Sequence, residues 1–158
     1  MTMDLFTHAS NPPLRLLVAF QEVFPALSPD WMVQVPQREM WLAAVPHQRD
    51  EFRLIVPDLQ ADTTFSLRSA KARRTVLHRP LPVWARYPAG VIVALCHNGM
   101  DSTGADAIIV GEEPAGPRYH HALGMAVAAL LCELHAKPYT AESLMGIVEQ
   151  VRREYIEA

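Results

Sequence analysis

Residues 111–131, GEEPAGPRYHHALGMAVAALL, lead from a loop rich in proline and glycine directly into a long apolar segment. The segment from His121 onward is apolar on nearly every side, which predicts a helix over 121–136 that is buried on two sides. The start of such a helix can bind anions, because its first backbone N–H groups have no partner within the helix and its dipole is positive there. The stretch therefore predicts a buried helix whose entry is a candidate phosphate site.

Hydrophobic periodicity and capping residues predict the elements on either side of this helix. Between residues 31 and 67, four short apolar runs separated by proline or charged turns are typical of an antiparallel meander. We expect strands near 31–35, 40–46, 52–57, 63–68 and 105–110, and helices near 12–24, 83–97, 121–136 and 140–155. This order predicts an α+β fold with one mixed, largely antiparallel sheet and helices packed on one of its faces.

The composition is that of one globular domain spanning residues 1–158, with 50% hydrophobic and 20% charged residues. The net charge of −3 gives no general attraction to polyanions, so nucleic acid is not an expected partner. We interpret the basic cluster at 68–79 as a solvated stretch between two elements. The longest apolar run, 122–131, is about half of the ~20 residues that span a bilayer, and the N-terminus has no signal-peptide pattern, so we expect a cytoplasmic protein without membrane contact.

The titratable residues form no metal-binding or acid–base motif. The seven histidines include no pair at i and i+4, and no Cys-x-x-Cys accompanies them, so we expect no metal site. His120 and His121 are neighbours on a helix start and would point in different directions, which is typical of surface histidines. Four carboxylates have no paired spacing and are interpreted as solvated: Asp101, Asp106, Glu112 and Glu113.

Three segments carry motifs that occur in the same order in a known family. Residues 20–24 read FQEVF, residues 84–91 (WARYPAGV) follow the pattern W-A-x-Y-x-x-G-V, and residues 104–116 (GADAIIVGEEPAG) carry G-x-D and P-x-G. Together they resemble the N-terminal domain of galactokinases, in the GHMP kinase superfamily that includes homoserine, mevalonate and phosphomevalonate kinases. The resemblance implies a ribosomal protein S5 domain 2-like fold and, in an intact enzyme, phosphate transfer from ATP to a sugar.

The phosphate-binding part of the resemblance is degenerate. The family pattern P-x-G-x-G-L-S-S-S-A wraps the nucleotide phosphates, whereas residues 114–122 read PAGPRYHHA. Pro114 and Gly116 remain, but the serines are replaced. Arg118 stands at the second glycine, where a β-carbon hinders a positive φ and a close backbone approach. The resemblance thus implies a former phosphate loop that no longer binds ATP.

Two further signatures of the family have no counterpart. The sugar-contacting pattern P-G-R-x-N-L-x-G-E-H-x-D belongs between residues 35 and 40, where only PQRE (36–39) is found. The catalytic aspartate of a G-x-x-D-Q pattern, which serves as the base for the sugar hydroxyl, belongs after the helix at 140–155 and is not found by residue 158. We therefore expect a truncated galactokinase-like domain with no catalytic residue and no C-terminal kinase domain.

The sequence leaves three functions open. The favoured hypothesis is a non-catalytic domain, a pseudokinase that needs no cofactor and acts through self-association, most simply as a homodimer, or through a protein partner. The alternative is a component of a galactose kinase that uses ATP and magnesium and is completed by another chain. The third is a new small-molecule site in the vacated cleft.

Two surfaces follow from these hypotheses. At the former phosphate loop, a guanidinium and a protonated imidazole beside a helix start would attract phosphate or carboxylate, and the alternative is a purely structural helix entry. The candidate anion-binding residues are Gly116, Arg118, His120 and His121. The expected interface for association is an apolar sheet face around Trp31, Met40 and Trp41, next to the short 36–39 turn.

Overall fold

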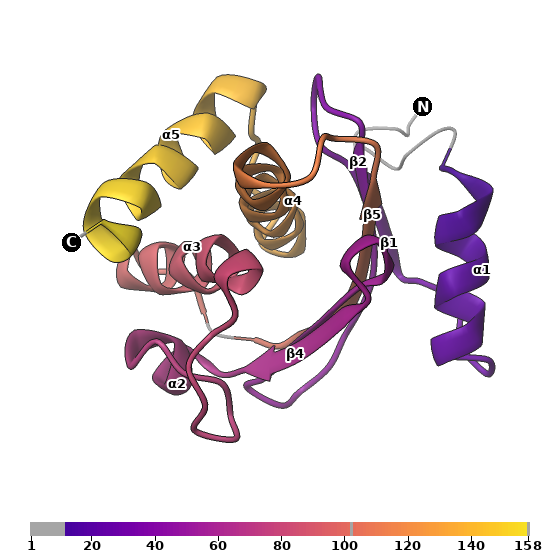
Figure 1. Ribbon diagram of the computed structural model, residues 1–158, viewed down its shortest axis with the longest axis horizontal. Coiled ribbons are helices and arrows are strands. Elements are labelled where there is room, and N and C mark those ends of the chain that lie inside the picture. Colours follow the sequence, from indigo (N-terminus) through magenta and orange to yellow (C-terminus); the bar gives the residue numbers. More distant parts are fainter. Residues whose placement is uncertain (1–11, 102, 158) are drawn as a thin grey trace.

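The computed structural model describes residues 12–101 and 103–157 as one sheet with helices on both of its faces (Figure 1). The strands are β1 (Trp31–Gln34), β2 (Met40–Pro46), β3 (Phe52–Val56), β4 (Ala61–Phe65) and β5 (Ala105–Gly111). The helices are α1 (Leu14–Val23), α2 (Leu67–Lys71), α3 (Arg86–His97), α4 (Pro117–Leu134) and α5 (Ala141–Val151). A 3₁₀ turn (Val83–Ala85) precedes α3, and a π turn (Arg152–Ile156) continues α5.

The sheet has the strand order β1-β2-β5-β3-β4. The two hairpins, β1–β2 and β3–β4, are antiparallel as expected, but β5 lies between them, antiparallel to β2 and parallel to β3. The predicted meander over the first four strands is therefore wrong. β5 takes the central position because six of its seven residues are buried, so both of its faces need cover.

The predicted fold class is confirmed, since the mixed and largely antiparallel sheet carries α3, α4 and α5 on one face (Figure 1). One helix differs from the expectation, because α1 packs on the opposite face. There Leu16 and Phe20 contact a second apolar cluster on β2 and β5 that includes Trp41 and Ile108. The sequence signal for this second layer is the uninterrupted apolar run at residues 40–44 (MWLAA). All five residues are buried, whereas a sheet covered on one face needs apolar residues only at alternate positions.

Two helices differ from the prediction: α4 starts earlier than expected, and α2 was not predicted. α4 begins at Pro117, four residues before the predicted start, because proline is favoured at the first helical position and Gly116 makes the entry turn with a φ of 104°. α2 was missed because its five residues are too few to reveal a helical period. Its start is fixed by a capping box in which Ser66 and Ser69 each accept a backbone N–H from the other, at 3.0 and 2.9 Å.

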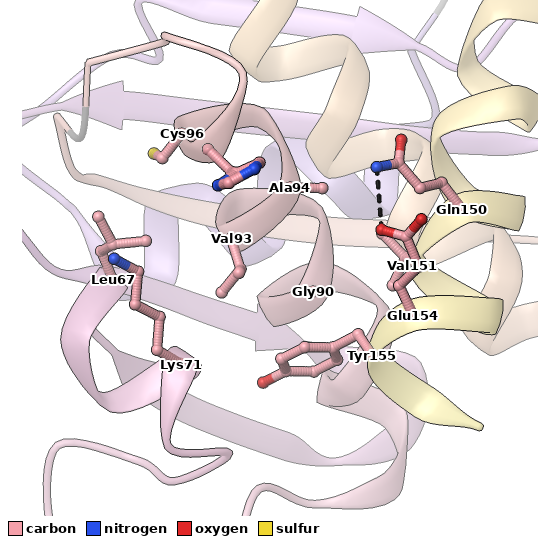
Figure 2. Close-up of a pocket in the computed structure, with 11 residues that line it drawn as sticks. Leu67, Lys71, Gly90, Val93, Ala94, Cys96, Gln150, Val151, Glu154 and Tyr155 are labelled. Atoms are coloured by element: carbon pink, nitrogen blue, oxygen red, sulfur yellow. Dashed lines mark hydrogen bonds between the residues drawn. The ribbon is translucent and has the colours of Figure 1, made fainter. Parts of the chain in front are cut away.

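The helices on the α4 side pack closely around a glycine of the 84–91 motif. A β-carbon on Gly90 would lie 2.4 Å from Val151 Cγ1 and 2.8 Å from Tyr155 Cδ2, so only glycine lets α3 approach the end of α5 so closely. Figure 2 shows this contact at the edge of a cavity of about 320 Å³ between α2, α3 and α5. The motif glycine thus serves packing. In the described part of the chain, no helix combines the length and apolar character that crossing a bilayer requires.

Candidate functional site

The loop between β5 and α4 is anchored by side chains from three other segments. The Gly111 N–H donates to Asp58 Oδ2 (2.8 Å), and the Gly111 carbonyl accepts from Arg15 Nη2 (2.8 Å). The backbone N–H of Glu112 donates to the carbonyl of Glu39 (2.8 Å). The loop therefore leaves the sheet along a path that α1, the turn after β3 and the β1–β2 hairpin all help to define.

Glu113 is the most buried carboxylate of this loop, with a side chain only 6% exposed. Arg38 holds both of its oxygens, from Nε to Oε2 (3.1 Å) and from Nη2 to Oε1 (3.2 Å). The Glu39 N–H donates to Oε2 (3.2 Å), and Arg118 Nη2 lies 3.4 Å from Oε1. The hydrogen bonds from Arg38 are the main reason that the pKa of Glu113 is lowered. The interpretation of Glu113 as a solvated loop residue is therefore wrong.

A second group of contacts is centred on Asp58, in the turn after β3. Asp58 accepts a hydrogen bond from the hydroxyl of Tyr119, in the first turn of α4, and pairs with Arg15. Arg15 also pairs with Glu112 (2.9 Å). Burial, followed by the hydrogen bond to Asp58, raises the pKa of Tyr119, so the phenol stays protonated as a donor at neutral pH.

These contacts form two neighbouring groups of ion pairs around the loop, which we together call the loop network. Its three carboxylates and three guanidiniums are Asp58, Glu112, Glu113, Arg15, Arg38 and Arg118. Each guanidinium already pairs with a carboxylate of the network, so the charges balance within the chain. The open hollow beside it, about 360 Å³, is lined by all three carboxylates but by only one of the guanidiniums, Arg15. Such a lining disfavours a phosphate group, because like charges repel at short range.

None of the four predicted anion-binding residues lines this hollow. Gly116 and Arg118 lie at the start of α4, where Arg118 is exposed apart from its contact with Glu113. His121 instead faces α3 and α5, with its ring 5.6 Å from that of Tyr87 and Nε2 3.9 Å from Glu149.

Burial lowers the pKa of both His120 and His121, so both imidazoles are predominantly neutral at pH 7. A neutral imidazole adds no positive charge to the helix start, and the attraction of an anion there would depend on Arg118 and the backbone. Anion binding by Gly116, Arg118, His120 and His121 stays a prediction.

Sequence reasoning missed the partners that organise the loop. Arg15 and Asp58 are separated by 43 residues, Arg38 and Glu113 by 75, and Arg15 and Glu112 by 97. No local spacing relates residues so far apart. The only local sequence feature that could have indicated the contact with Glu113 is Arg38, a charged residue in the short 36–39 turn where the sugar-contacting pattern is missing.

Three solved structures that superpose on this chain are kinases. The galactokinase of Lactococcus lactis, in complex with galactose, superposes with a TM-score of 0.61 and 19% identity over 78% of this chain and 31% of that one. The chain has a GHMP kinase-like fold. A mevalonate kinase (TM-score 0.59, 15% identity) and the mevalonate kinase of Methanococcus jannaschii (0.56, 14%) are also similar.

The GHMP kinase-like domain spans about a third of the length of these enzymes. It covers 38% of the first mevalonate kinase and 36% of the Methanococcus jannaschii enzyme, which in turn match 77% and 73% of this chain. Neither a protein-family model nor a curated protein sequence matches the chain. At these identities the likeness concerns the fold, and the activity must be argued from the residues of the site.

Proposed function

We propose that the chain is a non-catalytic galactokinase-like domain, a pseudokinase that acts by associating with itself or with a protein partner. The observation that carries the proposal is the loop network, which surrounds a loop that lacks the second glycine and the serines of the family pattern. Its guanidiniums are paired with carboxylates of the same chain. Nucleotide phosphates would have to break these pairs and lie next to Asp58, Glu112 and Glu113.

The backbone at the helix start supports the same conclusion. Proline at position 117 has no N–H to donate, and α4 starts there with regular helical conformation, so no second glycine turn closes over a ligand. The only hydroxyl in the first turn of α4, that of Tyr119, donates to Asp58. The nitrogen of Pro117 and the hydroxyl of Tyr119 are thus unavailable as donors to a phosphate.

Phosphate transfer tests this proposal. With galactose, ATP and magnesium, we expect the purified chain to produce no sugar phosphate above the uncatalysed background, because nothing in the loop is arranged to hold the nucleotide. Labelled ATP and separation of the products measure this. Turnover by the chain alone would contradict the proposal, and turnover only after addition of a second chain would establish the alternative, a galactose kinase component.

The apolar sheet face that we expected as the interface for association is not exposed. Met40 and Trp41 are buried within the chain, at 0% and 8% exposure, and Trp31 packs against the core, so they form no exposed apolar face. Exposed apolar side chains occur instead on the outer side of α1, where Leu14 is 74% exposed and Leu17 and Val18 are also exposed. Positions i, i+3 and i+4 share one helix face, so these three form a continuous apolar strip.

We expect the chain to self-associate through this strip. Light scattering at micromolar concentration should give about twice the monomer mass of 17.6 kDa. The double variant Leu14→Glu/Val18→Lys should be monomeric, because it places charges on the strip while its i, i+4 pair supports the helix. Met145→Lys, which alters an exposed apolar residue on α5, should remain a dimer. A monomeric wild-type chain, or equal loss of association in all variants, would refute this interface.

A further inference from the structure

The charge of the chain is distributed very unevenly along its sequence. Residues 63–100 contain six of the 14 lysines and arginines and not one of the 17 aspartates and glutamates. The remaining residues therefore hold eight basic and 17 acidic side chains. A protein with a net charge of −3 thus contains a segment that is strongly positive.

The positive charges of this segment are not neutralised within the described residues. No lysine or arginine of 63–100 forms an ion pair with any described residue. By contrast, each guanidinium of the loop network pairs with a carboxylate. Arg73 donates to the backbone carbonyl of Tyr155 (2.9 Å), and Arg74 donates to that of His78 (2.9 Å). Both bonds hold the guanidiniums in place and leave their charge available.

Several of these residues line one open hollow of about 450 Å³ beside α2. We call it the basic hollow. The residues that line it include two arginines and a histidine: Arg68, Arg74, His78, Ser66, Ser69, Ala72 and Val76. In Figure 1, α2 lies at the opposite end of the molecule from the loop that joins β5 to α4, so the hollow is distinct from the loop network.

The loop that carries Arg74 and His78 is held in a defined conformation. The N–H of Val76 donates to the carbonyl of Thr64 on β4 (3.0 Å), which fixes the loop to the sheet edge. The buried Thr75 hydroxyl oxygen accepts the N–H groups of Leu77 (3.2 Å) and Arg79 (3.3 Å) and closes the turn. The backbone positions of the loop residues that line the hollow are therefore fixed.

We propose that the basic hollow binds a phosphate monoester group. The side chain of Arg68 has no hydrogen bond or ion pair within the described residues, and the side chain of Arg74 uses only Nη1 on His78, so most of their guanidinium N–H donors are free. Two guanidinium forks together supply enough N–H donors for the three strong acceptor oxygens of a phosphate monoester. A carboxylate has only two oxygens, and a single fork can contact both, as Arg38 does in Glu113.

The monoester can come from a small phosphorylated molecule or from a phosphoserine on a polypeptide, and a titration separates the two. We would follow backbone amide resonances of the full chain on adding inorganic phosphate, a phosphoserine peptide with uncharged flanks, or its unphosphorylated form. Saturable shifts confined to residues near 66–79 are expected with the first two. Binding of the phosphopeptide about tenfold tighter than inorganic phosphate would indicate a polypeptide source, and equal affinities would indicate a small ester.

Two variants test whether the basic hollow is responsible. Arg68→Gln removes an exposed, unpaired guanidinium and is expected to weaken phosphate binding about tenfold while leaving the thermal midpoint unchanged. Arg153→Gln, which removes an exposed guanidinium from the turn after α5, is expected to leave binding unchanged within about twofold.

Three results would overturn the proposal. The first is the absence of saturable shifts with both phosphate probes. The second is equal binding by wild type and Arg68→Gln. The third is tighter binding of a thymidine oligonucleotide than of either monoester, since that would assign the positive segment to a phosphodiester backbone.

Discussion

Replacement of Gly104 by alanine is expected to lower the free energy of unfolding by about 3 kcal/mol or more. A β-carbon at this position would lie 2.0 Å from the Glu51 carbonyl oxygen and 2.3 Å from that of Arg49. Both are backbone atoms of the β2–β3 turn, which cannot move aside as a flexible side chain can. Gly104 also exchanges backbone hydrogen bonds with this turn, donating to Arg49 (3.0 Å) and accepting from His47 (3.1 Å). The clash therefore strains the point where β5 enters the sheet.

Urea denaturation measures this effect, and a second glycine provides a matched control. Gly146 lies within α5, and a β-carbon there would meet no atom within 4 Å. Gly146→Ala should therefore raise the free energy of unfolding by about 0.5–1 kcal/mol, because alanine restricts the unfolded chain and favours the helix. Two variants of identical chemistry should thus shift stability in opposite directions. Equal effects, or a neutral Gly104→Ala, would contradict the observed packing of the β5 entry.

The second large effect is expected at Glu113. Glu113→Gln should lower the free energy of unfolding by about 2–3 kcal/mol at pH 7, because it leaves the charge of the half-buried Arg38 without its main partner. The control is Glu112→Gln, which removes an exposed carboxylate whose partner Arg15 keeps its contact with Asp58. That change should cost less than about 1 kcal/mol.

The pH dependence gives this prediction a definite sign. The pKa of Glu113 is lowered in the folded state from its ordinary value of 4.5. Its carboxylate therefore stabilises the fold above that ordinary value, and the contribution is lost as the pH falls through the lower folded pKa. The stability difference between wild type and Glu113→Gln should accordingly be largest near neutral pH and shrink in acid. A difference that stays constant from pH 7 into acid would mean that the Arg38 contact contributes little.

The sequence predicted the elements well because their signals are local. Short apolar runs bounded by turns indicated the five strands, and the capping residue Thr140 indicated α5, whose start it closes with Ser143. The motifs at 84–91 and 104–116 carried the resemblance to the kinases whose structures share the fold.

What the sequence could not provide are relations between distant segments. The insertion of β5 between two hairpins depends on a parallel pairing of Phe52 with Ala105, which no turn sequence encodes. The position of α1 depends on which face of the sheet remains uncovered. The loop network depends on charges that meet only after folding, so Glu113 could not be distinguished from a solvated glutamate.

Binding of ATP with magnesium tests the central claim most directly, because it needs no substrate, no catalytic base and no partner chain. In a calorimetric titration of the purified chain, we expect no saturable heat up to about 1 mM nucleotide, the upper end of ordinary enzyme affinities. The reason is that the loop network already pairs the charges a phosphate would need. Stoichiometric binding with a Kd in the micromolar range would contradict the account and restore the phosphate loop to function.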